Sequence, residues 1–578
     1  MFKNTLSKII EFISRYPLLV TVSLYLISIL IVQPWGNYPV NDDFYYYTQV
    51  RAFSIGVFKK SALITPTFIL QGYLGLLWSA LFGISYVSLR FLTIFISILC
   101  LYIIFKILLT LNVKKTLILP CLLSITFNPI FFASSLTFMT ENYFLLFGLL
   151  SIFFFIKSQS NDKIRYLVIS SIFGGLSTLI RQYGFVLFPI FLIIDYYKPS
   201  QRKISRFLAI VLPFVVISTF GFLYPKYINP EFPKSFNILM LFTSLKSLFG
   251  RIFNIHYLSY SGFILLPFTI SKFIDLKRKE KISIGIISAF VGLYIYEGNL
   301  FKIGNIFYLE GLYAKMFNNI RLNLLNNIPF KLLLSFLISI SIVVIVESII
   351  KKSIKSFSEK HNFKIHISKT SLLLEILILS FYLIALITDK FYDRYLLNFF
   401  VITTIYSALK VNKYNYKNLL IMYFIIFLVS SITFLITVDY YRQMNLKWKM
   451  VEEITRAGEV KNTDIFLDSV YIKSALMEER DNYSGMKLLN IDDYNPICFI
   501  QEYSEGNGNY LAKLFNYLNE HPIIIKHLPN PRIENVSLLK SKDNDFDLND
   551  RLIMSEEYTT PIYNLIGEKM FVRTFCKY

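Results

Sequence analysis

The sequence predicts an all-α polytopic membrane protein with a small α/β domain at its C-terminal end. Of the 578 residues, 54% are hydrophobic and only 17% are charged, and long apolar runs recur over most of the chain. Soluble domains carry roughly 25% charged residues, so this chain has too little polar surface to form several water-exposed domains. The composition therefore excludes a disordered chain, and it nearly excludes a soluble cytosolic enzyme.

Thirteen apolar segments are long enough to be membrane-spanning helices, for which about 20 mostly apolar residues are needed. They lie near residues 16–33, 88–110, 115–132, 141–157, 165–181, 183–197, 205–224, 252–271, 282–297, 331–350, 370–388, 395–410 and 418–438. A further apolar stretch at 66–82 is either another span or a helix lying at the membrane surface.

The distribution of basic residues decides how 66–82 is interpreted. If this stretch does not cross, lysine and arginine clusters such as 272–281 and 351–369 fall on the same side of the membrane as the basic N-terminal segment. Basic loops stay in the cytoplasm. We therefore expect a juxtamembrane helix at 66–82 within the first external loop (34–87), a cytoplasmic N-terminus and an external C-terminus. The net charge of +21 is then an orientation signal, and no nucleic-acid partner is expected.

The polar C-terminal part is predicted to form a separate extracytoplasmic domain, so the chain divides into residues 1–438 and 439–578. An amphipathic helix is expected near 445–458. Strands are expected at 464–467, 496–503, 522–527 and 569–575. Cys498 and Cys576 both lie in this part, and a disulfide between them is compatible with an oxidising compartment.

Four polar motifs lie at the predicted external ends of the spans. They are Asn41–Tyr46, with Asp42 and Asp43; Thr137–Asn142, with Glu141; Leu179–Gly184, with Arg181; and Asp389–Tyr395, with Asp393 and Arg394. Charged groups near the bilayer are costly unless they are paired or functional. Carboxylates can deprotonate a hydroxyl group or hold a divalent cation, and guanidinium groups bind phosphate in bidentate fashion. These motifs together predict a site that handles a phosphorylated lipid.

At these residues the sequence resembles the GT-C membrane glycosyltransferases, within them the protein O-mannosyltransferase and lipid A aminoarabinose transferase group. The acidic pair followed by tyrosines resembles the start of such proteins. The blocks NPIFFASSLTFMTENYF (128–144), LIRQYG (179–184) and YDRYLL (392–397) resemble later landmarks in the same order. The resemblance covers about residues 15–410. It implies a cell-membrane enzyme that transfers a hexosyl or pentosyl group, with inversion, from a polyprenyl-phosphate carrier to a glycan, lipid or protein acceptor outside the cytoplasm.

The resemblance also implies roles for residues at matching positions. Asp42 is the expected general base, and Asp43 and Glu141 would orient the acceptor or a divalent cation; a metal held by Asp42 and Glu141 is left open. The family position of Glu141 is usually Asp. Arg181 and Arg394 would bind the donor phosphate.

Further residues are expected to support this site. A lysine, Lys59 or Lys60, is an additional phosphate ligand, although the second of the two prolines expected after it is absent. Tyr46, Gln182 and Asp393 are supporting residues. The sequence contains no Gly-rich nucleotide loop, so no nucleotide cofactor is expected, and a lipid-phosphate donor fits better than a nucleotide sugar.

Simpler interpretations exist for each motif. The acidic pair can be a helix N-cap, Glu141 can cap its span, Arg181 can be an interfacial residue, and Asp393 and Arg394 can form a local ion pair. Glu375, inside the eleventh span, is either a protonated structural residue or part of a site.

Alternative functions are a transporter or flippase of lipid-linked glycans and, less favoured, a glycan polymerase or ligase. A transporter would place charges near the midplane, whereas here they lie at the external ends of the spans.

Overall fold

The computed structural model describes residues 15–58, 64, 67–197, 202–228, 255–297, 328–358, 369–387, 392–410, 416–456, 465–466, 498–504, 551–558 and 570–576. The helices of the first half are α2 (Pro17–Val32), α3 (Asp43–Ser54), α4 (Ile69–Phe82), α5 (Tyr86–Thr110), α6 (Lys115–Thr126), α7 (Pro129–Ser135), α8 (Thr140–Asn161), α9 (Ile164–Thr178), η1 (Gln182–Val186), α10 (Leu187–Tyr196) and α11 (Lys203–Ile228). Those of the second half are α13 (Ile255–Asp275), α14 (Arg278–Glu297), α16 (Ile328–Ser358), α17 (Lys369–Ile387), η3 (Asp393–Leu396), α18 (Leu397–Lys410) and α19 (Tyr416–Arg456).

The chain is a multi-pass membrane protein. Each predicted span overlaps a helix, or a pair of consecutive helices, of the structure. Among the described residues, four helices are long and apolar enough to cross a bilayer, or five if one bent pair counts as a single span. The all-helical membrane class is thus confirmed, whereas the count of thirteen spans stays a prediction.

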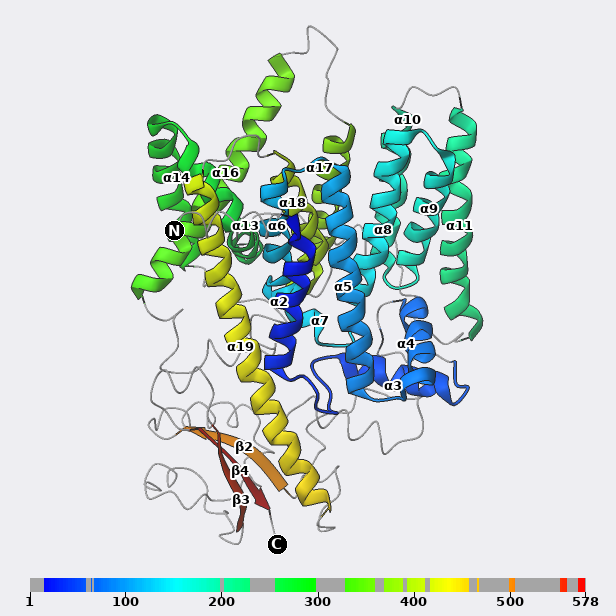
Figure 1. The fold of residues 1–578 in the computed structure, drawn as a ribbon, viewed down its shortest axis with the longest axis vertical. Helices are drawn as coiled ribbons and strands as arrows, with labels where there is room; N and C mark the ends of the chain where they lie inside the picture. Colours follow the sequence, from blue (N-terminus) through cyan, green and yellow to red (C-terminus); the bar gives the residue numbers. More distant parts are fainter. Residues whose placement is uncertain are drawn as a thin grey trace.

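The helices form three neighbouring groups (Figure 1). Helices α8, α9, α10 and α11 pack on one side, and α13, α14 and α16 pack on the other. Helices α2, α5, α6, α17 and α18 lie between them, and α3 and α4 lie together at one end. One continuous apolar core joins most of these helices.

The segment predicted as one span over 115–132 is a bent pair instead. Helices α6 and α7 meet at an angle of 63°. The residue before a proline is disfavoured in the α region. Asn128, which precedes Pro129, has ψ 128° and accepts a hydrogen bond from the N–H of Ile130 at 2.9 Å through its side chain. The break turns the chain, so that Thr137–Thr140 approaches α3.

The helix predicted at 66–82 is confirmed as α4, whereas its position at the membrane surface stays a prediction. Its first residues are tied to the turn after α9, because the N–H of Ile69 donates to the carbonyl of Leu179 at 2.8 Å. Gly72 and Gly75 allow close contact: an added Cβ would lie 2.6 Å from the Phe53 ring and 2.9 Å from Phe138 respectively.

Helix α19 corrects the prediction for the end of the last span. The prediction of a separate amphipathic helix near 445–458 is wrong, because one 41-residue helix runs without interruption from Tyr416 to Arg456. Polar residues after 438 do not end a helix by themselves, and this stretch contains no proline or glycine before Gly458. The predicted boundary at 438/439 therefore falls inside a helix.

Beyond α19, the described residues form a four-stranded sheet. Its strands are β1 (Ile465–Phe466), β2 (Cys498–Ser504), β3 (Arg551–Tyr558) and β4 (Met570–Cys576), in the order β1-β2-β4-β3. β1 pairs parallel with β2, and the other two pairs are antiparallel. Three of the predicted strands are thus found, β3 was not predicted, and the one expected at 522–527 lies outside the described residues. A complete α/β domain stays a prediction.

The register of the sheet makes the predicted disulfide testable. Cys498 on β2 pairs directly with Cys576 on β4, and directly opposed residues of antiparallel strands have Cα atoms about 4.5–5.5 Å apart, which a disulfide can bridge. We expect the purified protein to contain this bond, with no free thiol at either position in mass spectra taken without reductant. The buried Cys100 and Cys121, which are free, serve as internal controls. Thiol labelling of all four cysteines would contradict the prediction.

Candidate functional site

The four polar motifs meet where four helices begin. Asp42 is the N-cap residue of α3, Glu141 lies in the first turn of α8, and Arg181 precedes η1. Asp393 and Arg394 open η3. Each motif lies at the start of a helix, and three of these helix starts lead into apolar helices.

Two arginines and two carboxylates form a network. Arg181 Nη2 lies 2.5 Å from Glu141 Oε1, and its Nε donates to the Thr140 hydroxyl at 2.6 Å. Arg394 Nη2 lies 3.0 Å from Asp42 Oδ2, and its Nε lies 3.4 Å from the same Glu141 oxygen. Glu141 therefore bridges the two guanidinium groups, while Asp42 contacts only Arg394 among them.

Burial separates the two carboxylates. The side chain of Glu141 is 3% exposed, and those of Arg181 and Arg394 are 7% and 6% exposed, whereas Asp42 is 37% exposed. Within the described part of the chain, Glu141 Oε2 and Arg394 Nε are buried without a hydrogen-bond partner. Buried polar groups are normally satisfied, so Glu141 Oε2 is an exception within the network, and Arg394 Nε has only its 3.4 Å ion-pair contact with Glu141.

Tyrosine rings line the arginines. The Arg394 guanidinium carbon lies 4.7 Å from the Tyr392 ring centre, and that of Arg181 lies 5.1 Å from the Tyr395 ring centre. Such contacts favour a guanidinium over an ammonium group. Neither tyrosine was predicted as a site residue, although the sequence YDRYLL places one on each side of the Asp–Arg pair. Tyr46, which was predicted, packs against Phe68 in a tilted arrangement with ring centres 4.9 Å apart. Burial raises the pKa of Tyr46, and the two arginines oppose this shift.

The structure does not bring Asp43 into this network, although it neighbours Asp42. Asp43 is fully buried, and its Oδ1 accepts the N–H of Val40 at 2.6 Å. Its other oxygen lies 3.8 Å from Arg90 Nη2. The carboxylate therefore faces the loop before α3, and an orienting role for Asp43 toward the acceptor stays a prediction that this geometry does not favour.

The remaining predicted residues are placed as follows. Gln182 is exposed. Asp393 is fully buried and interacts with the hydroxyl of Tyr260 on α13. Lys59 and Lys60 lie outside the described residues. Glu375, left open by sequence, accepts hydrogen bonds from Tyr406 at 2.6 Å and Ser371 at 2.9 Å, so it links α17 to α18.

The residues present do not fit a divalent cation well. Glu141 and Asp42 each contact a guanidinium group, whereas Mg²⁺ and Ca²⁺ take oxygen-rich coordination shells. In the described segments, no three His, Cys, Asp or Glu side chains are grouped to hold a metal ion. No step is assigned to a metal here.

A second cluster of a buried arginine with carboxylates lies at the opposite end of α8. Arg206 at the start of α11 pairs with Asp195 of α10, and its Nη1 lies 2.6 Å from Asp162 just after α8. The 22 residues of α8 separate this cluster from Glu141 by about 33 Å at 1.5 Å per residue. The sequence gives no sign of this cluster, because Asp195 and Arg206 lie in different predicted spans.

The buried carboxyl of Asp43 predicts a pH dependence of stability. Burial raises its pKa to about 7, although Arg90 and the Val40 N–H act in the opposite direction. The folded protein then keeps a proton that the unfolded chain releases above pH about 4. The free energy of unfolding should therefore fall as pH rises from about 4 to 7.

Thermal unfolding of the wild type and Asp43→Asn at pH 5 and pH 8 checks this expectation. The melting temperature of the variant relative to the wild type should be higher at pH 8 than at pH 5. A difference that is the same at both pH values would contradict it.

Comparison with known proteins gives one family match. Residues 67–222 match the family described as dolichyl-phosphate-mannose-protein mannosyltransferase. This confirms the resemblance predicted from sequence over a segment that contains Glu141 and Arg181 but neither Asp42 nor Arg394. No curated protein matches the chain by sequence.

Two solved structures of ArnT from Cupriavidus metallidurans are similar. The structure bound to undecaprenyl phosphate has a TM-score of 0.38 and 11% identity, covering 86% of this chain and 94% of that one. The apo structure has a TM-score of 0.34 and 11% identity, covering 96% of this chain and 97% of that one.

Proposed function

We propose, with the family match of residues 67–222 as the premise, that the chain is an integral membrane glycosyltransferase. It takes a sugar from a polyprenyl-phosphate carrier and transfers it to an acceptor hydroxyl. The observation that carries the proposal is the pair of buried arginines bridged by Glu141 beside a partly exposed Asp42.

The donor phosphate binds at Arg181 and Arg394. Guanidinium forks match phosphate oxygens and become more effective in a site of low dielectric constant. Glu141 holds both forks in place, and its bridging position keeps two like charges close together. The tyrosine rings of Tyr392 and Tyr395 support the flat faces of the guanidinium groups.

Asp42 is the general base. It is the more exposed of the two carboxylates in the network, so an acceptor arriving from water can reach it. The acceptor oxygen attacks the anomeric carbon, the bond from that carbon to the phosphate oxygen breaks, and polyprenyl phosphate leaves with the bonding electrons. The hydroxyl proton passes to Asp42, and the single displacement inverts the anomeric centre.

Donor binding and base activation are coupled in this arrangement. Arg394 Nη2 lies 3.0 Å from Asp42 Oδ2. A phosphate that takes over this donor weakens the ion pair, which frees the carboxylate to accept a proton. The enzyme is thus set up to bind the lipid donor before the acceptor reacts.

The site lies on the extracytoplasmic side of the membrane in this proposal. The positive-inside distribution of the loops supports that orientation. A reporter that fluoresces only in the cytoplasm, fused to the C-terminus, should stay dark. Fluorescence would reverse the topology and place the site on the cytoplasmic face.

The activity is tested with purified protein in sealed vesicles, a radiolabelled polyprenyl-phosphate sugar and a membrane extract as acceptor source. Label is expected to move from the lipid donor into the acceptor fraction, with release of polyprenyl phosphate. If label crosses the vesicle membrane while it stays on the lipid donor, the chain is a transporter and the transferase proposal is wrong.

A further inference from the structure

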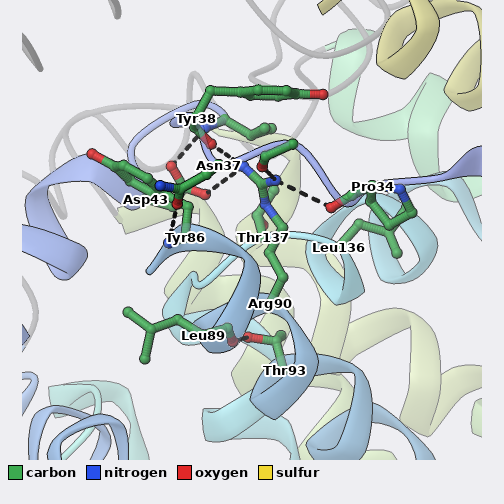
Figure 2. A network of polar contacts seen from close by, with 12 residues as sticks. Pro34, Asn37, Tyr38, Asp43, Tyr86, Leu89, Arg90, Thr93, Leu136 and Thr137 are labelled. Carbon is green, nitrogen blue, oxygen red and sulfur yellow. Dashed lines mark hydrogen bonds and ion pairs between the residues drawn. The ribbon is translucent and has the colours of Figure 1, made fainter. Parts of the chain in front are cut away.

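The loop that leads into α3 is held by a single arginine from α5. Arg90 donates through Nη1 to the carbonyls of Pro34 at 3.2 Å and Gly36 at 2.6 Å, and through Nη2 to the carbonyl of Tyr38. Figure 2 shows its guanidinium group enclosed by this loop. The Tyr38 ring centre lies 5.0 Å from the guanidinium carbon, and Arg90 is 1% exposed.

The end of the same loop is closed by Asp43. Asn41 takes a left-handed conformation with φ 59°, and Asp43 Oδ1 accepts the N–H of Val40 across this turn at 2.6 Å. Asp43 Oδ2 lies 3.8 Å from Arg90. Asp42 is thus placed between a fixed turn and the first residue of α3, and its side chain is directed to Arg394 by backbone that Arg90 holds.

The outer half of α19 is the second anchor of the loop. The Tyr38 hydroxyl donates to Asn445 Oδ1 at 2.7 Å, and the Tyr38 ring stacks on Trp448 with centres 5.6 Å apart. Asn445 Nδ2 donates in turn to the carbonyl of Gln33 at 3.2 Å. The packing leaves no room for a larger residue at Gly36, where a Cβ atom would lie 1.8 Å from the Tyr38 ring.

We propose that Arg90 is a positioning residue for Asp42 and that Tyr38 connects this role to Asn445 and Trp448 on α19. The inference rests on the proposed function, because it assigns a purpose to the placement of the general base. Three carbonyl acceptors, one carboxylate and one aromatic ring surround one guanidinium group. Its three carbonyl hydrogen bonds need a planar group with several donors in a fixed arrangement, which an ammonium group lacks.

The expected kinetic effect is on the rate of the chemical step. Arg90 does not contact Arg181 or Arg394 through any hydrogen bond or ion pair described here, so the donor-binding groups are left in place when it changes. A displacement of about 1 Å in a catalytic group can cost about 10²-fold in rate. For Arg90→Lys we expect kcat to fall about 10- to 100-fold while KM for the donor stays within about 2-fold.

Tyr38→Phe is a milder variant that keeps the ring and removes only the hydrogen bond to Asn445. We expect this variant to fold and to lower kcat about 3- to 10-fold, because a hydrogen bond between uncharged groups contributes about 1 kcal/mol. Tyr406→Phe is the matched control, because it also removes one hydroxyl, bonded to Glu375 at 2.6 Å, and should leave kcat unchanged. Equal kcat in the wild type and Tyr38→Phe would overturn the link to α19.

The combination of Arg90→Lys with Asp42→Asn separates positioning from a structural role. If Arg90 acts through Asp42, adding Arg90→Lys to Asp42→Asn should lower the residual rate little further. A merely structural role predicts that Arg90→Lys lowers the melting temperature and leaves kcat of the folded protein unchanged, which would overturn the proposal. If Asp42→Asn itself retains full activity, the proposed function is at fault and not the role of Arg90.

Discussion

Replacing Asp42 with asparagine is expected to lower the rate of sugar transfer by about 10²- to 10⁴-fold, the usual contribution of a general base. The change keeps the size of the side chain and its ability to accept a hydrogen bond from Arg394, so KM for the donor should change little. The measurement is single-turnover transfer of radiolabelled sugar from a polyprenyl-phosphate donor. The fold loss in rate should be the same at low and at saturating donor concentration, because the carboxylate acts only in the transition state.

Two variants make this result specific. Asp162→Asn is a matched control, since Asp162 is also a partly exposed carboxylate paired with an arginine, 2.6 Å from Arg206; its transfer rate should equal that of the wild type. Asp43→Asn should lose less than about 10-fold, because Asp43 faces Arg90 and not the arginine pair. If Asp43→Asn loses more activity than Asp42→Asn, Asp42 is not the general base.

Replacing Arg394 with glutamine is expected to abolish most of the affinity for the donor phosphate. Removal of one partner of a buried charged pair costs about 2–5 kcal/mol, which corresponds to roughly 30- to 4,000-fold in a dissociation constant. Glu141 keeps its contact with Arg181 in this variant, so one buried pair remains intact. Equilibrium binding of polyprenyl phosphate to the purified protein measures the effect without the chemical step.

The control for this change is Arg206→Gln at the opposite end of α8. It also removes a buried, doubly paired arginine, and so it should lower the melting temperature without weakening polyprenyl phosphate binding. Arg394→Lys should restore part of the affinity at most, because an ammonium group lacks the planar fork that rests on Tyr392. Binding that is as tight in Arg394→Gln as in the wild type would contradict the phosphate assignment.

Helix positions could be predicted well because the length and polarity of each apolar run do not depend on tertiary contacts. The break between α6 and α7 was signalled by Asn128-Pro129, but the hydrophobic content of both halves hid it. The continuity of α19 could not be predicted for the opposite reason. A change from apolar to polar side chains looks like a boundary in sequence, although the backbone continues as helix.

The site motifs could be predicted because polar residues at the ends of apolar runs are few. The ion pairs that these residues form could not be predicted, since the sequence does not show which of the neighbouring carboxylates at 42 and 43 reaches an arginine of the site. The left-handed conformation at Asn41 and the N–H of Val40 turn one of them into the protein and leave the other at the arginines. Arg90 was missed because it lies inside an apolar run, and nothing local shows that its guanidinium group reaches a loop more than 50 residues earlier.

The uninterrupted course of α19 fixes how its outer turns are rotated relative to its membrane-spanning part, and therefore how they meet the loop before α3. Tyr441, Asn445 and Trp448 lie on one stripe of the helix, spaced by four and three residues, and Tyr441 donates to the carbonyl of Leu136 at 2.9 Å. Each residue of an α-helix advances about 100° and 1.5 Å. A single insertion between the last membrane-facing turn and Tyr441 would rotate this stripe away from the loop, and a four-residue insertion would keep its direction but shift it by about 6 Å. The number of residues in this stretch is therefore as closely constrained as the identity of the residues that make the contacts.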